Sequence, residues 1–254
     1  MIKKKIMKYA DEMPPVVVLA GGFGTRLASV VNDRPKIMAP IKGIPFIAYL
    51  FAWFQKNSVQ RVCLSLGYRA EQVLAYINTN SHDFLQLEYA VEEKVLGTAG
   101  GVAHCLHSCS MFQIQSLSSQ EIVIVNGDSW VTLDMLDFVA KARASSCDIS
   151  ICSVEVDEAS RYGLLDIDDQ SGLLKGFKEK SQENSQGWIN AGVYFFRNNA
   201  LTMLSSLKQG SIEFDVFSNI EPTKIFVYKS DAEFIDIGTP ESYRLAEEII
   251  QSVE

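Results

Sequence analysis

Paired cysteines, long apolar runs and an excess of basic residues are all missing from this sequence. The five cysteines are scattered and form no CxxC pair, which favours buried thiols in a reducing cytoplasm over a disulfide framework. The longest apolar stretch, residues 44–54, has about 11 residues, whereas a membrane span needs roughly 20. The basic start, residues 1–8, leads into polar residues rather than an apolar core, so a signal peptide is not expected. These absences predict a soluble, cytoplasmic protein without a membrane partner.

The net charge of -8 argues against a nucleic-acid partner, because proteins that bind nucleic acids usually carry a basic surface. Small anionic substrates stay compatible with it, since a few local Lys and Arg residues and a divalent cation suffice to bind phosphates. The 254 residues, 47% of them hydrophobic and 21% charged, are enough for a substantial core.

One cluster of potential metal ligands stands at residues 104–109. On a helix Cys105 and Cys109 share a face, whereas His104 and His107 point elsewhere. The cluster is therefore interpreted as structural rather than as a metal site.

The first 155 residues alternate between β-rich and helical patterns. Strands are predicted at 16–19, 61–66, 87–91, 122–126 and 148–154, and helices at 45–56, 70–77, 99–107 and 133–144. This alternation predicts an α/β fold with a mainly parallel, mixed sheet flanked by helices.

The pattern changes after residue 155. Short β-like segments at 163–167, 173–177 and 188–196 predict a small antiparallel or mixed β extension over the site. A last strand at 224–227 precedes a closing helix, with Thr239 as its N-cap and Pro240 as its first residue, that runs to about residue 253. With no repeat or linker in the chain, residues 1–254 are predicted to form a single domain.

A glycine-rich loop directly follows the first predicted strand. Residues 19–27 read Leu-Ala-Gly-Gly-Phe-Gly-Thr-Arg-Leu, and such glycines let backbone N–H groups turn towards a phosphate. The loop lacks the Gly-Lys-Ser/Thr end of a Walker A motif, and Leu27 replaces the third glycine of the dinucleotide fingerprint. Glycine content alone leaves a tight turn equally plausible. Arg26, and Lys36 after Pro35, favour a phosphate site because they add two cations.

This combined motif, Gly-Gly-x-Gly-Thr-Arg-Leu followed by Pro-Lys and a second Pro, resembles the sugar-phosphate nucleotidyltransferase family over roughly residues 16–250. Ile37 and residues 28–31 depart from the family pattern without changing a charged group. The resemblance implies a Rossmann-like fold, with a nucleotide-binding part at about 14–155 and a sugar-phosphate-binding part at about 156–254. Residues 32–41 look most like those of the heptose-1-phosphate guanylyltransferases, which implies GTP as the nucleotide.

The family likeness also implies nucleotide-binding residues. They are Leu19, Ala20, Gly21, Gly22, Gly24, Thr25, Gly97, Thr98, Ala99 and Gly100. Residues 97–100 match a Gly-Thr-Ala-Gly segment that lines the base pocket in the family. The alternative reading of these residues is a helix start capped by Thr98. Glu92 and Glu93 could accept hydrogen bonds from guanine, but solvated charges at a strand end are the favoured interpretation.

Two acidic residues far apart in the chain are candidate metal ligands. Asp128 follows an apolar strand, where the ligand crevice of an α/β sheet lies, although a lone Asp there is more often a cap or turn residue. Asp236 is flanked by apolar residues, so burial of its unpaired charge would be costly. The resemblance implies that both carboxylates bind one Mg2+.

The acceptor site is implied by likeness to the family alone. Glu179 matches a residue on the sugar hydroxyls and Lys180 one on the sugar phosphate, although an exposed ion pair is the commoner fate of such a dipeptide. Asn190 and Gly192 match further sugar-phosphate segments, as does Gly163, next to a Tyr162 that could simply pack.

The implied reaction joins a nucleoside triphosphate to a sugar 1-phosphate and releases pyrophosphate. An anionic phosphate oxygen attacks the α-phosphorus in line, so catalysis consists of positioning and charge neutralisation. The groups assigned to this work are Arg26, Lys36, Lys180 and the Mg2+ on Asp128 and Asp236. Alternatives are cytidylyl, thymidylyl or uridylyl transfer to another phosphorylated acceptor, and a non-catalytic sensor of sugar nucleotides. The oligomeric state stays open, a homo-oligomer included.

Overall fold

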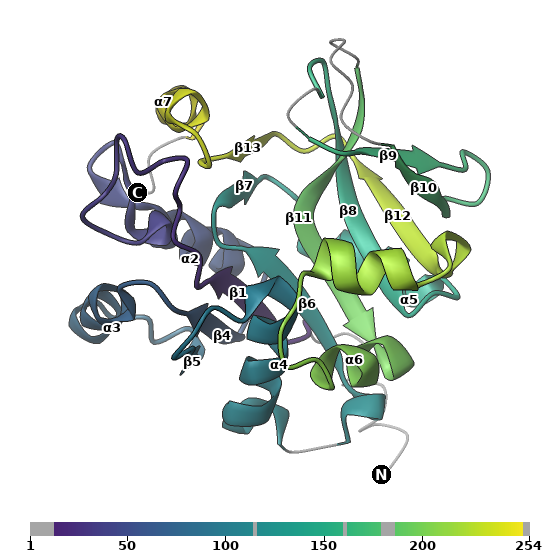
Figure 1. Ribbon diagram of the computed structural model, residues 1–254, viewed down its shortest axis with the longest axis horizontal. Coiled ribbons are helices and arrows are strands. Elements are labelled where there is room, and N and C mark those ends of the chain that lie inside the picture. Colours follow the sequence, from purple (N-terminus) through teal and green to yellow (C-terminus); the bar gives the residue numbers. More distant parts are fainter. Residues whose placement is uncertain (1–12, 114–115, 160–161, 179–185, 251–254) are drawn as a thin grey trace.

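The β-branched run near the start of the chain forms the central strand β1 (Val16–Ala20) of a nine-stranded sheet (Figure 1). Strand β1 pairs in parallel with β4 (Arg61–Leu66) on one side and β6 (Glu121–Asn126) on the other, and β4 pairs in parallel with β5 (Gln86–Val91). The first three side chains of β1, Val16 to Val18, are buried because the sheet is covered on both faces. The computed structural model describes residues 13–113, 116–159, 162–178 and 186–250.

The antiparallel part of the sheet begins at β11 (Gly187–Arg197). This long strand pairs antiparallel with β6, with β8 (Ile149–Val156) and with β9 (Leu164–Ile167). Strand β12 (Ile225–Ser230) extends the sheet beside β8 in parallel, and β10 (Leu174–Lys178) forms a hairpin with β9. The predicted mixed, Rossmann-like α/β sheet with a small antiparallel extension is confirmed.

Helices cover both faces of the sheet. One hydrophobic cluster packs under α2 (Phe46–Lys56), α3 (Ala70–Thr79), α5 (Met135–Ala144) and α7 (Pro240–Ile249). On the opposite face, α4 (Gly97–Ser108) and α6 (Asn198–Ser205) lie side by side over a second cluster (Figure 1). Val16 and Val18 point into the first cluster and Val17 into the second. Across the described ranges, the helices lack the length and hydropathy that a bilayer crossing requires.

Two pairs of short strands stand apart from the main sheet. Strand β7 (Ser129–Val131) pairs antiparallel with β13 (Phe234–Asp236), and β2 (Pro40–Ile41) pairs with β3 (Ile44–Pro45). The remaining turns of helix are Lys36–Met38, Ser110–Phe112, Leu117–Ser119, Ile212–Val216, Phe217–Asn219 and Pro222–Lys224. The β7–β13 pair matters most for the site, because it joins segments about a hundred residues apart in the chain.

Most predicted elements are present, with shifted ends. Strand β4 has the predicted bounds, and Thr239 caps α7 as expected, since its hydroxyl accepts from Ser242 N at 3.3 Å. The prediction that residues 133–144 are all helical is wrong at its start, because Asp134 is an N-cap that accepts from Asp137 N at 3.0 Å. A helix start capped by Thr98 is also wrong: α4 begins at Gly97, and the Thr98 hydroxyl accepts from Ile212 N at 2.8 Å.

All five cysteines are buried and free. Cys63 Sγ lies 2.9 Å from Cys109 Sγ beneath α4. The two histidine rings of the 104–109 cluster contact backbone carbonyls, His104 that of Val91 and His107 that of Ser205. These contacts tie α4 to its surroundings, as a structural role requires.

Candidate active site

The carboxyl ends of β1, β4 and β6 open into a first pocket of about 230 Å³. Its lining residues come from those strand ends, the glycine loop and the start of α4; they are Leu19, Ala20, Gly21, Gly22, Gly24, Lys36, Ile37, Ser65, Glu92, Val95, Gly97, Thr98, Asn126, Gly127 and Asp128. This is the edge at which α/β sheets bind ligands. The structure therefore brings both glycine segments into one cavity.

Two glycines of the loop are needed for different reasons, Gly21 for a close contact and Gly24 for its backbone conformation. A Cβ on Gly21 would lie 1.9 Å from Glu92 Oε1, and Gly24 has a φ of +62° that favours glycine. Thr25, by contrast, is exposed. The loop thus presents backbone to the pocket over Gly21 and Gly22, as phosphate or base contacts require.

The Gly97–Thr98 start of α4 forms the opposite wall. Gly97 has a φ of +74°, and a Cβ there would lie 2.4 Å from the Gly210 carbonyl oxygen. Ala99 is fully buried, and its N–H donates to that same carbonyl at 2.9 Å. Ala99 and the buried Gly100 thus support this wall, while Gly97 and Thr98 line it.

Glu92 also lines the first pocket, on the wall near Val95. Its Oε2 accepts from Leu96 N at 2.7 Å, and its Oε1 lies against Gly21 and Gly67. Glu93 is exposed. The favoured interpretation of both residues as solvated charges thus fits Glu93, whereas the Glu92 carboxylate is half-buried and held in place.

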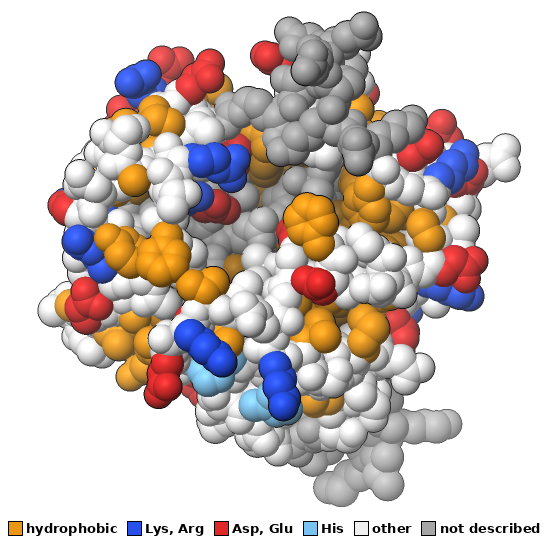
Figure 2. Space-filling view, in the orientation of Figure 1, with side chains coloured by type: hydrophobic (Ala, Val, Ile, Leu, Met, Phe, Trp, Pro, Cys, Tyr) orange, Lys and Arg blue, Asp and Glu red, His pale blue; other side chains and the backbone are white. Residues whose placement is uncertain are grey.

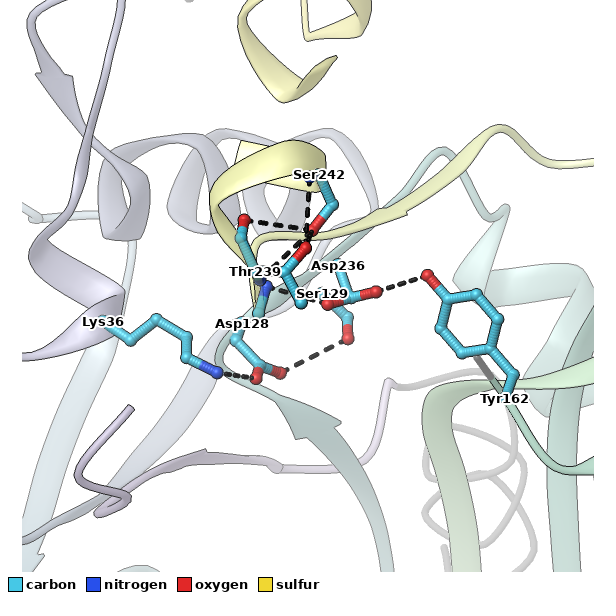
Figure 3. A network of polar contacts seen from close by, with 8 residues as sticks. Lys36, Asp128, Ser129, Tyr162, Asp236, Thr239 and Ser242 are labelled. Atoms are coloured by element: carbon cyan, nitrogen blue, oxygen red, sulfur yellow. Dashed lines mark hydrogen bonds and ion pairs between the residues drawn. The ribbon is translucent and has the colours of Figure 1, made fainter. Parts of the chain in front are cut away.

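Lys36 and Asp128 both line this pocket and form an ion pair, with Nζ and Oδ2 2.7 Å apart (Figure 3). The Lys36 side chain is 16% exposed and that of Asp128 31% exposed, so both charges still reach solvent or a ligand. Gly127 lets the chain pass close to β1, where its N–H donates to the Leu19 carbonyl at 2.9 Å. Strand packing therefore positions Asp128.

The β7–β13 pair brings Asp236 to Asp128. Asp236 is paired with Ser129 across the two strands, and Ile237 N donates to the Asp128 carbonyl at 2.8 Å. In Figure 3 the two carboxylates lie side by side, with Lys36 on one side and Tyr162 on the other. Asp236 Oδ1 accepts from Gly238 N at 2.8 Å, and Oδ2 accepts from the Tyr162 hydroxyl.

A second pocket, of about 260 Å³, adjoins the first and shares Asn126 and Asp128 with it. It is lined by Arg26, Asn126, Asp128, Ser129, Tyr162, Gly163, Asn190, Tyr194, Glu213, Phe234 and Asp236. Figure 2 shows a hollow on this face of the molecule, with basic and acidic side chains at its wall. Two cavities that meet at Asp128, with the Asp236 carboxylate on the wall of the second, suit two anionic ligands joined by a cation.

A buried hydrogen-bond network underlies the second pocket. Asn190 Nδ2 donates to the Tyr194 hydroxyl at 2.9 Å, and Tyr194 donates to Glu213 Oε1 at 3.0 Å. Burial, and then the Glu213 carboxylate, raise the pKa of Tyr194 well above its usual range, so its hydroxyl stays a donor. Gly192, at a φ of +74°, lies against Asn126, which an added Cβ would approach to 2.7 Å.

Most of the site residues predicted from sequence meet in these two pockets. Arg26, Gly163 and Asn190 line the second pocket together with both aspartates, while Gly192 supports it through Asn126. Glu179 and Lys180 lie outside the described residues. The sequence reading had no role for Ser65, Tyr194 or Glu213, and only Ser65, at the end of a predicted strand, could have been found from the strand-end rule.

Whether this site can bind a metal ion depends on which donor atoms its side chains provide. Among the described residues no group of three or more His, Cys, Asp or Glu side chains is placed to hold a metal ion. Two carboxylates that face a phosphate-sized pocket are nevertheless the incomplete oxygen set that Mg2+ uses when substrate phosphates and water complete its shell. Asp128 and Asp236 fit that pattern.

Comparison with known proteins agrees with this geometry. The model of the nucleotidyl transferase family matches residues 15–252. The chain is 32% identical over 240 residues to a D-glycero-alpha-D-manno-heptose 1-phosphate guanylyltransferase of Aneurinibacillus thermoaerophilus, covering 92% of this chain and 97% of the relative. The Campylobacter jejuni enzyme of the same name is 30% identical over 229 residues, covering 89% and 96%.

A solved structure is similar over nearly the same length. HddC from Yersinia pseudotuberculosis, also solved complexed with GMP-PN, has a TM-score of 0.79 and 32% identity, covering 93% of this chain and 99% of HddC. The sequence and the fold are thus each similar to known proteins over about nine tenths of this chain.

Proposed function

Because this chain belongs to the nucleotidyl transferase family and is an enzyme of that class, we propose that it joins GTP to a heptose 1-phosphate or a related sugar 1-phosphate. The products are a GDP-sugar and pyrophosphate. The observation that carries this proposal is the pair of adjoining pockets that share Asn126 and Asp128. The first pocket takes the nucleotide and the second the sugar phosphate.

The reaction proceeds by direct displacement. An anionic oxygen of the sugar phosphate attacks the α-phosphorus of GTP, and the bond from that phosphorus to the bridging oxygen breaks. The bond's electrons leave with pyrophosphate. No side chain has to remove a proton from the attacking oxygen, because it is already anionic, so the protein's work is alignment and charge neutralisation.

Three basic side chains neutralise the charge of the two substrates. Lys36 neutralises the triphosphate from the first pocket, where its ammonium lies next to Asp128. Arg26, on the wall of the second pocket, stabilises the charge that develops as the two substrates react. Lys180 neutralises the attacking phosphate.

Mg2+ would be held by Asp128 and Asp236, and when bound it would supply positive charge to the phosphate oxygens. The two carboxylates repel each other unless a cation lies near them. Lys36 next to Asp128 and Tyr162 next to Asp236 position the two carboxylates.

Guanine is the base that the first pocket favours. Guanine presents N1–H and N2–H donors on its pairing edge, whereas adenine presents an acceptor at N1. The half-buried Glu92 carboxylate, held by Leu96 N, is an acceptor suited to such donors. The relatives' guanylyltransferase names and the HddC complex with GMP-PN support the same choice.

A substrate grid tests the proposal. Four nucleoside triphosphates are combined with mannose 1-phosphate, glucose 1-phosphate and a heptose 1-phosphate, and pyrophosphate release is measured, with Asp128→Asn as the inactive control. We expect the fastest release with GTP and the heptose 1-phosphate. Release that is faster with another nucleotide would overturn the choice of base, and no release with any pair would overturn the function.

A further inference from the structure

Three of the five cysteines meet beneath α4, away from both pockets. Cys63 lies on β4, Cys105 on α4, and Cys109 directly follows the last residue of α4. All three belong to the hydrophobic cluster that α4 covers, and Cys63 Sγ lies 2.9 Å from Cys109 Sγ. The reaction proposed above uses none of these thiols. Two sulfur atoms this close, on segments 46 positions apart in the chain, are a candidate site for oxidation.

The distance between Cys63 and Cys109 suits a disulfide bond. The two sulfur atoms would have to approach by less than about 1 Å, because an S–S bond is about 2.05 Å long. Cys105 is a poorer partner for Cys109. Cys109 N donates to the Cys105 carbonyl at 3.0 Å, so the two residues keep helical spacing, with Cβ atoms about 5–6 Å apart. A disulfide needs Cβ atoms about 3.5–4.5 Å apart.

Cys109 is the thiol that reacts first with an oxidant. Hydrogen bonds from the Cys105 thiol and then from the Cys63 thiol lower the pKa of Cys109, and the thiolate is the form that attacks an oxidant. Hydrogen bonds to Cys105 and Cys109 raise the pKa of Cys63, so Cys63 keeps its proton. Cys109 is 2% exposed, whereas the other two are fully buried. Helix ends open more readily than helix interiors, so a small oxidant can reach Cys109 by a local opening.

We propose that Cys63 and Cys109 are a thiol pair that hydrogen peroxide oxidises to a disulfide, which links β4 to the end of α4. The Cys109 thiolate attacks one peroxide oxygen, the O–O bond breaks, and Cys109 becomes a sulfenic acid while the leaving hydroxide takes up a proton. The Cys63 sulfur then attacks the Cys109 sulfur. The S–S bond forms, the S–O bond breaks, and the hydroxide leaves as water with the Cys63 proton. Two thiols are oxidised, and the peroxide is reduced to two molecules of water.

This disulfide would join the elements that form two walls of the first pocket. Ser65, two residues after Cys63 on β4, lines that pocket, as do Gly97 and Thr98 at the start of α4. A cross-link between positions this far apart strongly restricts the unfolded chain, whereas the small movement of the sulfur atoms leaves the folded walls nearly in place. The disulfide is therefore a reversible cross-link that stabilises the fold. The inference goes beyond the proposed function and does not rest on it.

The test starts from fully reduced wild-type protein treated with millimolar hydrogen peroxide. Within hours the number of free thiols should fall by two, and peptide mapping without a reductant should identify Cys63 joined to Cys109. The Tm should rise by at least about 5 °C, because the unfolded chain loses conformational freedom. A dithiol reductant should restore both the free thiols and the original Tm.

Three substitutions make the result specific. Cys63→Ala and Cys109→Ala each remove one partner, so neither variant should form the disulfide or gain thermal stability. Cys147→Ala is the matched control, because Cys147 is also a buried free thiol and, at 4% exposed, is more accessible than Cys109. The control variant should keep both responses to peroxide. If an alanine variant does not fold, the mapping of the wild-type protein still decides the pairing.

The inference is overturned if the wild-type protein keeps all five thiols until it is unfolded, or if peptide mapping finds a different pair. Oxidation of Cys109 to a sulfinic acid without an S–S bond would also overturn it, as would a Cys63–Cys109 disulfide that lowers the Tm. None of these measurements uses a nucleotide or a sugar phosphate. Failure of the proposed function is therefore distinguishable from failure of this inference.

Discussion

Replacing Asp236 with Asn tests the paired carboxylates most directly. The side chain accepts two hydrogen bonds, from Gly238 N and from the Tyr162 hydroxyl. Asn keeps one acceptor oxygen and turns an NH2 group towards the other donor, so one hydrogen bond to a charged acceptor is lost. That loss costs about 1.5–3 kcal/mol of folding free energy.

The same substitution removes a repulsion. If the two carboxylates are close enough to hold one Mg2+, they lie about 5 Å apart, and two unit charges at that distance repel by about 3 kcal/mol at an effective dielectric constant of about 20. Lys36, 2.7 Å from Asp128, already offsets part of this repulsion. The two effects nearly cancel, so without Mg2+ the free energy of unfolding should change by about 1 kcal/mol or less, a Tm shift of about 2–4 °C.

Catalysis should respond far more strongly than stability. Asp236→Asn removes one of two protein ligands, so we expect the Mg2+ concentration for half-maximal pyrophosphate release to rise at least about tenfold, and turnover at saturation to fall about a hundredfold. Wild-type protein should gain thermal stability from Mg2+ and GTP together, because both bind the folded state. The variant should gain much less.

Asp231→Asn is the control, since it removes an exposed carboxylate from the segment just before β13. It should match the wild type in both assays. The reasoning is refuted if Asp236→Asn keeps wild-type Mg2+ dependence, or if its Tm falls by more than about 10 °C without metal, which would make Asp236 a structural residue.

Three other substitutions test the remaining assignments. Arg26→Ala should lower turnover about a hundredfold, a loss of roughly 3 kcal/mol of transition-state stabilisation, without unfolding the protein because Arg26 is exposed; near-normal turnover with saturating substrates would remove it from the mechanism. Lys180→Ala should raise the KM for the sugar phosphate more than the KM for GTP, and the reverse order in steady-state kinetics would put the acceptor in the wrong pocket. Glu92→Gln should lower the ratio of kcat/KM for GTP over ATP by about tenfold or more, whereas an unchanged ratio would show that Glu92 does not read the base.

Local sequence patterns predicted the long elements because each pattern extends over a whole element. The run at 61–66 became β4 with the same bounds, and the Thr239–Pro240 pair became the start of α7. A local preference was misleading where a tertiary contact outweighed it, as the alternative reading of Thr98 shows. Thr98 is a good N-cap by type, but its hydroxyl accepts from Ile212 N, more than a hundred residues away in the chain.

Elements with few residues could not be predicted. Strands β7 and β13 have three residues each, too short for a periodic pattern, and they form because they pair with each other. The turn of helix Ile212–Val216, which carries Glu213, likewise follows from Ser211, whose hydroxyl accepts from Glu213 N and Phe214 N. No repeating hydrophobic pattern predicts the β7–β13 pair or this turn of helix.

The sequence by itself determined which residues could carry the chemistry and which family they indicate. These residues are the glycine loop with Arg26 and Lys36, and the two aspartates. Motifs of this kind are readable because each needs neighbouring residues in a fixed order. Which side chains share a pocket was decided only by the tertiary structure. Strand pairing and crossover set the distances between Asp128 and Asp236, and between Thr98, Tyr194 and Glu213, and such distances depend on contacts that the linear order of residues does not contain.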